Sequence, residues 1–167
     1  MANVLTLLTG VVLLLVQGIL ARHLPTEYLA PSLILPMVLY MAVGEFSLER
    51  GVSLSFVLGY FTDAFLGSAL GLWTFALVSI FLLARVAGLK LFLHGVVFQV
   101  LLTFVGSLTV GVIMTGLLLV FDRRPVAVLG AMGVVTAQSL ATAACAPAVF
   151  ALLARVPTAT APRAEEA

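Results

Sequence analysis

The chain has 167 residues, of which 63% are hydrophobic and only 9% are charged, and its mean hydropathy is +1.27. A water-soluble domain of this length needs far more polar surface, so the composition excludes a soluble protein and indicates a polytopic membrane protein. The net charge of +1, without a basic cluster, argues against nucleic acid as a partner. The single cysteine, Cys145, cannot form a disulfide within the chain.

The first apolar segment, residues 4–21, is long enough for either a signal peptide or a membrane span. No lysine or arginine precedes it, and Leu20-Ala21-Arg22 is a poor cleavage site for a signal peptidase. We therefore predict a retained transmembrane helix at this position.

Five further apolar segments follow, and a span needs about 20 residues to cross a hydrocarbon core of about 30 Å. Together they predict an all-α polytopic membrane protein whose six transmembrane helices form a compact bundle, over residues 4–21, 28–43, 51–66, 68–86, 91–121 and 126–153. Pro36 is expected to kink or shorten the second helix, and Pro147 lies inside the sixth.

The fifth segment is too long for one upright span and too short for two, which favours a single long, tilted helix and leaves open whether it bends near Gly106 or Gly111. The polar, proline-containing residues 156–167 predict a disordered cytoplasmic tail.

Lysine and arginine residues in the connections predict the orientation in the membrane. The excess of positive charge lies on the side that would hold both termini, so both are expected in the cytoplasm. With six spans that side receives Arg50, Arg85, Lys90, Arg155 and Arg163, and the other receives Arg22, Arg123 and Arg124.

Residues 59–71 cover the end of the third predicted helix and the start of the fourth, and they contain a single acid, Asp63. Gly59 and Gly67 lie four residues before and after it, so the three residues would share one helix face. A carboxylate at membrane depth is costly, and it could be a partner-contact or transport residue. The alternative is that it accepts hydrogen bonds from the exposed amides where the fourth helix begins. Its position just before the turn at Gly67-Ser68 favours this second interpretation, and Ser68 is expected to cap the fourth helix.

Small residues recur every four positions on the fifth and sixth predicted helices, and such stripes let helix backbones approach closely in lipid. We expect close packing at Ser107, Gly111 and Thr115 on the fifth helix and at Gly133, Ala137, Ala141 and Cys145 on the sixth. The sequence leaves open whether the neighbouring helix belongs to this chain. We interpret the polar residues inside apolar segments as interhelical hydrogen-bonding groups: Gln17, Gln99 and Gln138.

No constellation of residues indicates catalysis. His23 and His94 are far apart, and neither has a second ligand at the spacing that a metal site requires. The sequence contains no G-x-S-x-G nucleophile elbow, no H-E-x-x-H motif and no phosphate-binding glycine loop. We therefore predict no enzyme activity, no metal and no cofactor.

The segment LGYFTDAFLGSALG resembles the most recognisable segment of the rod-shape-determining MreD family, with the pattern L-G-x-x-x-D-x-x-x-G-S-x-L-G. The matching positions are Leu58, Gly59, Asp63, Gly67, Ser68, Leu70 and Gly71. Pro31 with residues 33–40 is similar to that family's second span, and Pro147 opens a P-x-x-x-x-L-L-x-R pattern similar to its last helix. Two features depart from the family: Thr142 stands where an asparagine is common, and basic residues are missing at the amino terminus.

The resemblance implies a non-enzymatic scaffold of the bacterial inner membrane. Such proteins bind MreC, and through it the MreB filament, and they act beside the RodA glycosyltransferase and a class-B penicillin-binding protein. Their role is to organise or activate side-wall peptidoglycan synthesis and so maintain rod shape. The alternative is a substrate-binding component of an energy-coupling-factor vitamin transporter, which is similar in size and hydropathy. Those components often carry an A-x-x-x-A motif on the first helix, and the first apolar segment of this sequence has no such motif.

Overall fold

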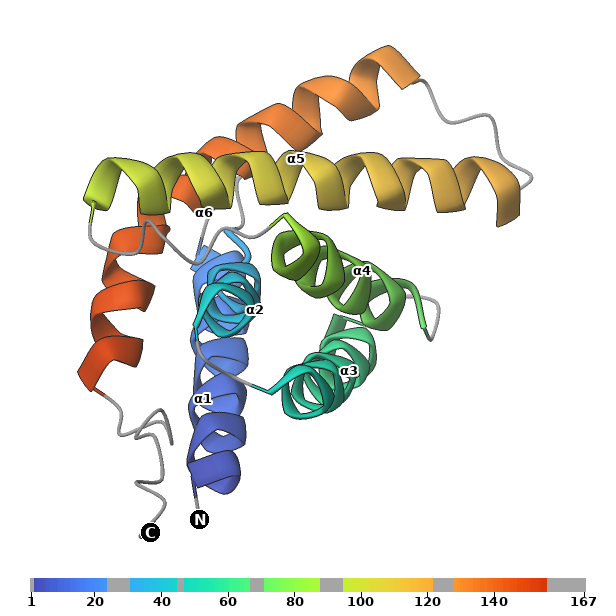
Figure 1. The fold of residues 1–167 in the computed structure, drawn as a ribbon. Helices are drawn as coiled ribbons and strands as arrows, with labels where there is room; N and C mark the ends of the chain where they lie inside the picture. Colours follow the sequence, from blue (N-terminus) through green and yellow to red (C-terminus); the bar gives the residue numbers. More distant parts are fainter. Residues whose placement is uncertain are drawn as a thin grey trace, which may run out of the picture.

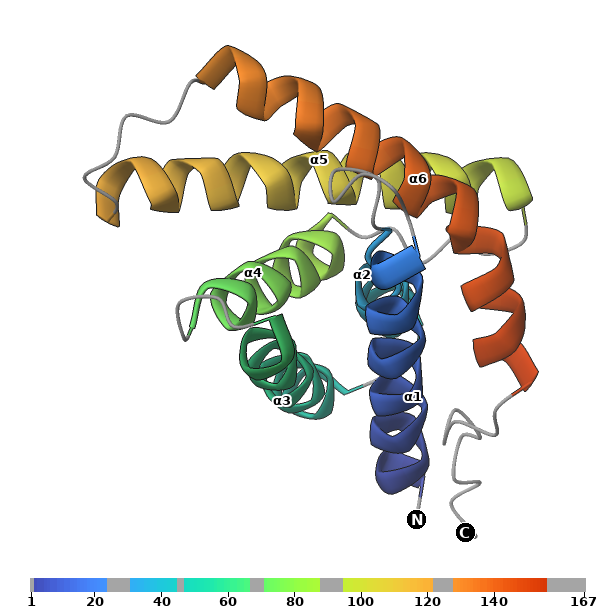
Figure 2. The same ribbon diagram turned by 180° about the vertical axis from the view of Figure 1, so that it is seen from behind.

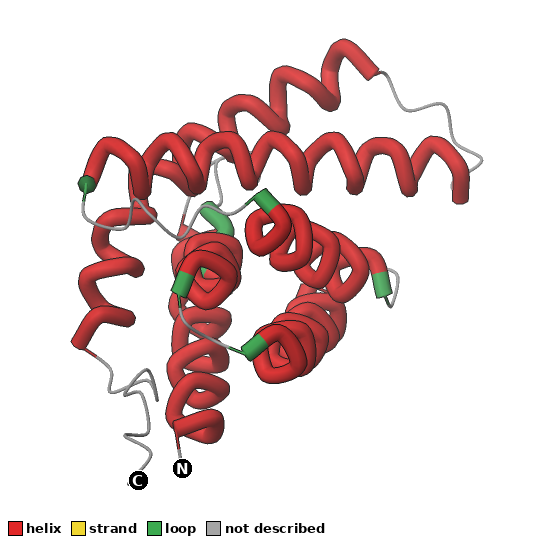
Figure 3. Tube along the Cα trace, in the orientation of Figure 1, coloured by secondary structure: helices red, strands yellow, loops and turns green. Residues whose placement is uncertain are grey.

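The computed structural model describes residues 2–23, 31–44, 47–66, 71–87, 95–121 and 128–155. Within these ranges the regular structure is entirely helical (Figure 3). The six helices are α1 (Ala2–His23), α2 (Ile34–Val43), α3 (Leu48–Leu66), α4 (Leu72–Val86), α5 (Val96–Phe121) and α6 (Val128–Arg155). The prediction of an all-α fold with six helices is therefore confirmed.

Three of the helices are long and apolar enough to cross a membrane, judged by length and composition. The stretches that qualify are Val4–Arg22 in α1, Val96–Val120 in α5 and Met132–Arg155 in α6. Large apolar side chains are exposed along α1, α3 and α5. Exposed apolar surface of this extent is unfavourable in water and favourable in lipid, which indicates a membrane protein.

The short helix α2 lies at the centre of the molecule. It contacts each of the other five helices, and all of its residues except Tyr40 are buried. In Figure 1, α1, α3 and α4 lie beside it and α5 runs across the group. The ring of Tyr40 packs edge-on against Phe150 of α6, with 5.5 Å between the ring centroids. A helix that is apolar on every side belongs inside a protein, and α2 is surrounded in this way.

The second predicted span, residues 28–43, differs from α2 in length. The helix begins only at Ile34 and has 10 residues, so it is about 15 Å long. Residues 31–33 precede it without helical structure, and residues 28–30 lie outside the described part of the chain. Pro36 stands in the first turn of α2, where an amide has no partner inside the helix, and of the two effects predicted for it the structure has the shorter helix.

The other helices follow the predicted spans more closely. α3 begins three residues before the predicted 51–66, and α6 begins and ends two residues after the predicted 126–153. α4 and α5 begin at Leu72 and Val96, several residues later than predicted. The intervening residues 67–70 and 88–94 are outside the described ranges, as is the predicted tail, 156–167.

The two long helices α5 and α6 differ in shape. α5 runs straight in the views of Figures 1 and 2. α6 changes direction along its length, which Figure 2 shows from the opposite side. Pro147 lies inside α6, and a proline within a helix removes one hydrogen bond and bends the axis.

The small-residue stripe on α5 packs against neighbouring helices of this chain. A Cβ atom on Gly111 would overlap the side chain of Val135 on α6, so the two helices are in close contact there. Ser107 is buried. Thr115 is half-buried, and its hydroxyl donates to the carbonyl of Gly111 over 2.8 Å.

The stripe on α6 has a different environment. Gly133 has no atom of the described chain within 4 Å of the position of a Cβ, and Ala137 is exposed. Ala141 and Cys145 are half-buried. The first part of this stripe therefore faces away from the described residues, whereas the stripe on α5 faces them.

Candidate functional site

The buried carboxylate of Asp63 binds the first turn of α4. Its Oδ2 accepts hydrogen bonds from the backbone amides of Gly71 (3.0 Å) and Thr74 (3.1 Å), and from the hydroxyl of Thr74 (2.8 Å). Its Oδ1 accepts a hydrogen bond from the amide of Trp73 (2.9 Å). The side chain is 0% exposed. The first amides of a helix have no partners inside it, and the helix dipole favours a negative charge at this end, so Asp63 satisfies both requirements.

Two glycines permit this arrangement for different reasons. A Cβ on Gly59 would overlap the backbone of Thr74, so this glycine is needed for the close approach of α3 to α4. Gly71 has open space around it, but its φ of +102° lies in the left-handed region that other residues rarely adopt. Gly67 and Ser68 lie outside the described residues. The bonds that cap α4 in the described chain come from Asp63, as the favoured interpretation predicts, and the additional cap predicted at Ser68 falls outside the described residues.

Buried side chains from two other helices bind the segment that leads into α2. The amide of Ser32 donates to Oγ1 of Thr142 on α6 over 3.1 Å, and the amide of Leu33 donates to Oε1 of Gln17 on α1 over 2.9 Å. The Thr142 hydroxyl also donates to the carbonyl of Gln138 over 2.8 Å. Non-helical backbone at membrane depth must be bonded within the protein, and these contacts supply the partners.

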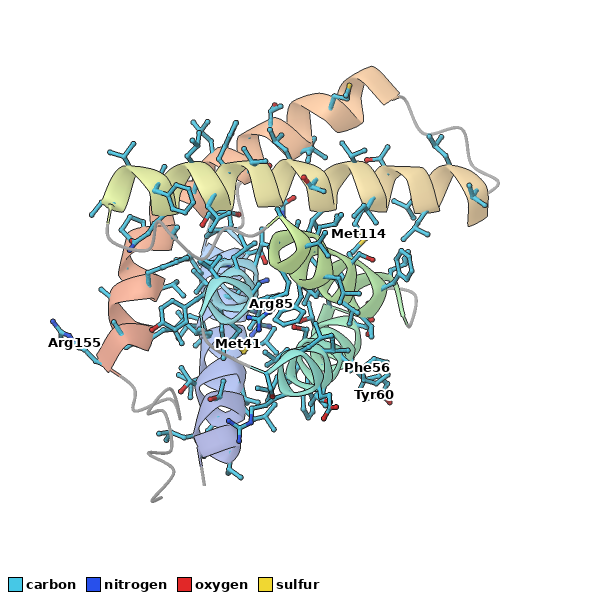
Figure 4. The ribbon with its side chains drawn as sticks, viewed as in Figure 1. Met41, Phe56, Tyr60, Arg85, Met114 and Arg155 are labelled. Carbon is cyan, nitrogen blue, oxygen red and sulfur yellow. The ribbon has the colours of Figure 1, made fainter. Side chains whose placement is uncertain are left out.

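At the opposite end of α2, Arg85 binds the last carbonyl groups. Its Nη1 donates to the carbonyl of Gly44 over 2.9 Å and, at a longer distance of 3.4 Å, to that of Ala42. Figure 4 shows Arg85 pointing into the group of helices beside Met41, whereas Arg155 projects away from the end of α6. The carbonyl end of a helix carries a partial negative charge, so a guanidinium is favourable there.

The sequence did not reveal the roles of Arg85 and Thr142. Arg85 was assigned to a connection, but it lies in the last turn of α4 and is half-buried. A basic residue in the last turn of a helix can bind carbonyl groups, and this is the signal that could have indicated its role. Thr142 was noted only as a departure from the family pattern.

Two buried hydroxyl groups are exceptions to the general pairing of polar atoms. Ser55 Oγ and Thr103 Oγ1 have no hydrogen-bond partner in the described chain. Within the part of the chain that the structure describes, there is no group of three or more His, Cys, Asp or Glu side chains that could bind a metal ion. His94 lies outside the described ranges. The polar contacts of this region therefore join helices, and they place no reactive set of side chains together.

Removing the acceptors at Asp63 should destabilise the fold in a graded way. Asp63→Asn keeps one acceptor oxygen but turns an NH₂ group toward an amide, so at least one hydrogen bond is lost. Asp63→Leu loses all four, and each unpaired buried amide costs about 1–3 kcal/mol. We expect an intermediate yield and melting temperature for Asp63→Asn and little folded, membrane-inserted protein for Asp63→Leu. The yield is measured by size-exclusion chromatography in detergent and the melting temperature by thermal unfolding of the same samples. Glu49→Gln, on the exposed start of α3, is the control and should change neither quantity. Equal losses in the two Asp63 variants would argue against the capping role.

The hydroxyl group of Thr142 should contribute more to the stability of the fold than the shape of the side chain does. Thr142→Val retains the shape but leaves the Ser32 amide without its acceptor, so the melting temperature should fall by an amount that corresponds to about 1–3 kcal/mol. Thr142→Ser retains the hydroxyl and should lie closer to the wild type. Thr109→Val on α5 is the matched control, because that hydroxyl donates to the carbonyl of Val105 in its own helix. If Thr142→Val and Thr109→Val were equally stable, the bond to Ser32 would contribute nothing.

Comparison with known proteins identifies the family. No curated protein and no solved structure matches the chain, so the likeness to energy-coupling-factor components stays a hypothesis. The family model described as rod shape-determining protein MreD matches residues 1–154. This range contains Asp63, Gly59, Gly71 and Pro147. The chain therefore belongs to the MreD family of rod shape-determining proteins.

Proposed function

We propose that this protein is a non-enzymatic, multi-pass scaffold of the bacterial inner membrane that helps to organise or activate side-wall peptidoglycan synthesis. The observation that carries the proposal is the family match over residues 1–154. Membership of this family implies a role in determining rod shape. The described polar contacts support a scaffold, because their side chains bind helix ends and hold the helices in fixed positions.

The partners in this proposal are an MreC-like protein, bound directly, and through it the MreB filament. A RodA-type glycosyltransferase and a class-B penicillin-binding protein complete the assembly. The outer faces of the molecule support binding within the membrane. Phe56 and Tyr60 point outward from α3 (Figure 4) and are 55% and 53% exposed. Val12 on α1 is 54% exposed. Apolar faces of this kind can be covered by lipid or by the transmembrane helix of a partner.

We further propose that the chain crosses the membrane six times, with both termini in the cytoplasm. The first turn of α1 and the last turn of α6 lie at the same end of the molecule (Figures 1 and 2), as an even number of crossings requires. α2 is too short to cross a core of about 30 Å alone, so its crossing would include the preceding residues 31–33, whose amides are bound by Gln17 and Thr142. Arg85 lies at the carboxyl end of α2. It belongs to the side of the membrane with more basic residues, and such an excess favours the cytoplasmic side.

Depletion in the source bacterium, if that bacterium is a rod, tests the proposal. We expect depleted cells to become round, and the wild-type gene to restore rods. The purified protein should co-purify with the MreC-like protein of the same organism. Asp63→Leu should fail to restore shape because it does not accumulate in the membrane, whereas the Glu49→Gln control should restore it. Normal shape on depletion, together with no binding to the MreC-like protein, would contradict the scaffold proposal. Thermal stabilisation of the purified protein by a vitamin would support the transporter alternative instead.

A further inference from the structure

A pocket of about 610 Å³ lies between the starts of α2 and α4 on one side and the α5–α6 pair on the other. Met114 of α5, one of the residues that line it, lies between α5 and α4 in Figure 4. The walls are mainly apolar, and none of the lining residues is charged. The side chains that form most of the wall are Leu35, Leu72, Trp73, Met114, Leu118 and Val134.

Two of the four hydroxyl groups of the lining are already used within their own helices. Thr115 donates to the carbonyl of Gly111 over 2.8 Å, and Ser139 donates to the carbonyl of Val135 over 2.7 Å. A charged ligand would find no opposite charge in this pocket and would lose its hydration on entering, which is costly. The chemistry of the walls therefore favours an uncharged, apolar occupant.

We propose that this pocket holds one acyl chain of a membrane phospholipid. In a protein surrounded by lipid, an empty apolar pocket loses the dispersion contacts of its walls. Water is not a suitable occupant, because it needs two to four polar partners. The pocket volume of about 610 Å³ is many times the roughly 30 Å³ that one water molecule occupies in the liquid, so several methylene groups of a chain fit in it. An acyl chain is flexible and can follow the shape of the walls.

A helix of a partner protein is less suited to the same pocket. A helix with its side chains is about 10 Å wide, and close helix contacts in lipid need small residues open at the surface. Gly111 is the glycine among the lining residues, and the side chain of Val135 already fills the space beside it. The serines of the lining are buried, so the pocket offers little small-residue surface to a helix, whereas a single hydrocarbon chain can follow its walls.

The inference rests on the membrane location of the protein and is independent of the proposed partners. The full chain is reconstituted in phosphatidylcholine–phosphatidylglycerol vesicles that contain a phospholipid with a diazirine on its acyl chain. After irradiation, the labelled residues are identified by mass spectrometry. We expect labelling of Met114 and Val134 to exceed that of Val12 and Phe56, which face outward, several-fold, because a retained chain stays in contact longer. Equal labelling of the two sets would overturn the proposal.

Two variants test whether the pocket itself is responsible. Val134→Trp fills the pocket from α6 and should remove the excess label at Met114, whereas Val12→Trp on the outer face of α1 should leave it unchanged. If Val134→Trp lowers the melting temperature, Leu118→Trp fills the same pocket from α5. An excess of label that persists in a folded pocket variant would contradict the proposal. Cross-linking of Met114 to a transmembrane helix of the MreC-like protein, with loss of the lipid label, would also contradict it. Neither result bears on the depletion experiment, so the two proposals can fail separately.

Discussion

In a chain surrounded by lipid, each backbone amide or carbonyl outside a helical ladder needs a partner within the protein. Asp63 of α3 supplies the partners at the start of α4, and Arg85 of α4 supplies them at the end of α2. Gln17 and Thr142 bind the amides that lead into α2. In each case the side chain belongs to a different helix from the backbone that it binds. These bonds at the helix ends therefore join five of the six helices, all except α5, in addition to their apolar faces.

This constraint explains how a helix as short as α2 can be the centre of the fold. Its apolar surface is buried by the other five helices, and both of its ends are bonded by their side chains. An unpaired buried amide costs about 1–3 kcal/mol, and the whole fold of a typical domain is stable by only about 5–15 kcal/mol. The few polar residues in this apolar chain are thus important for stability. They also hold the starts of α2 and α4 in position. These starts form one side of the pocket, which lies where they meet α5.

Much of this arrangement was predictable from the sequence, because the signals are local. Long apolar segments predicted the helices. The spacing of Asp63 from Gly67-Ser68 favoured hydrogen bonding at the start of α4. Pro36 predicted a kink or a shorter second helix, but the sequence did not predict which side chains bind the segment before α2. The amides of this segment are bonded by Gln17 and Thr142, which lie 16 and 110 positions away in the chain. A stripe of small residues predicts that a face can pack closely but does not identify its neighbour. Gly111 accordingly contacts Val135, whereas Gly133 faces away.

Hydrogen–deuterium exchange of single amides in lipid nanodiscs tests the central claim most directly, because exchange depends on how often a hydrogen bond opens. The amides of Gly71, Trp73 and Thr74 lack helical partners, and the account predicts that they exchange as slowly as amides in the middle of α4. In the Asp63→Asn protein the Trp73 amide should exchange much faster, while the middle of α4 is unchanged. Rapid exchange of these amides in the wild type, or no difference between the two proteins, would contradict the account.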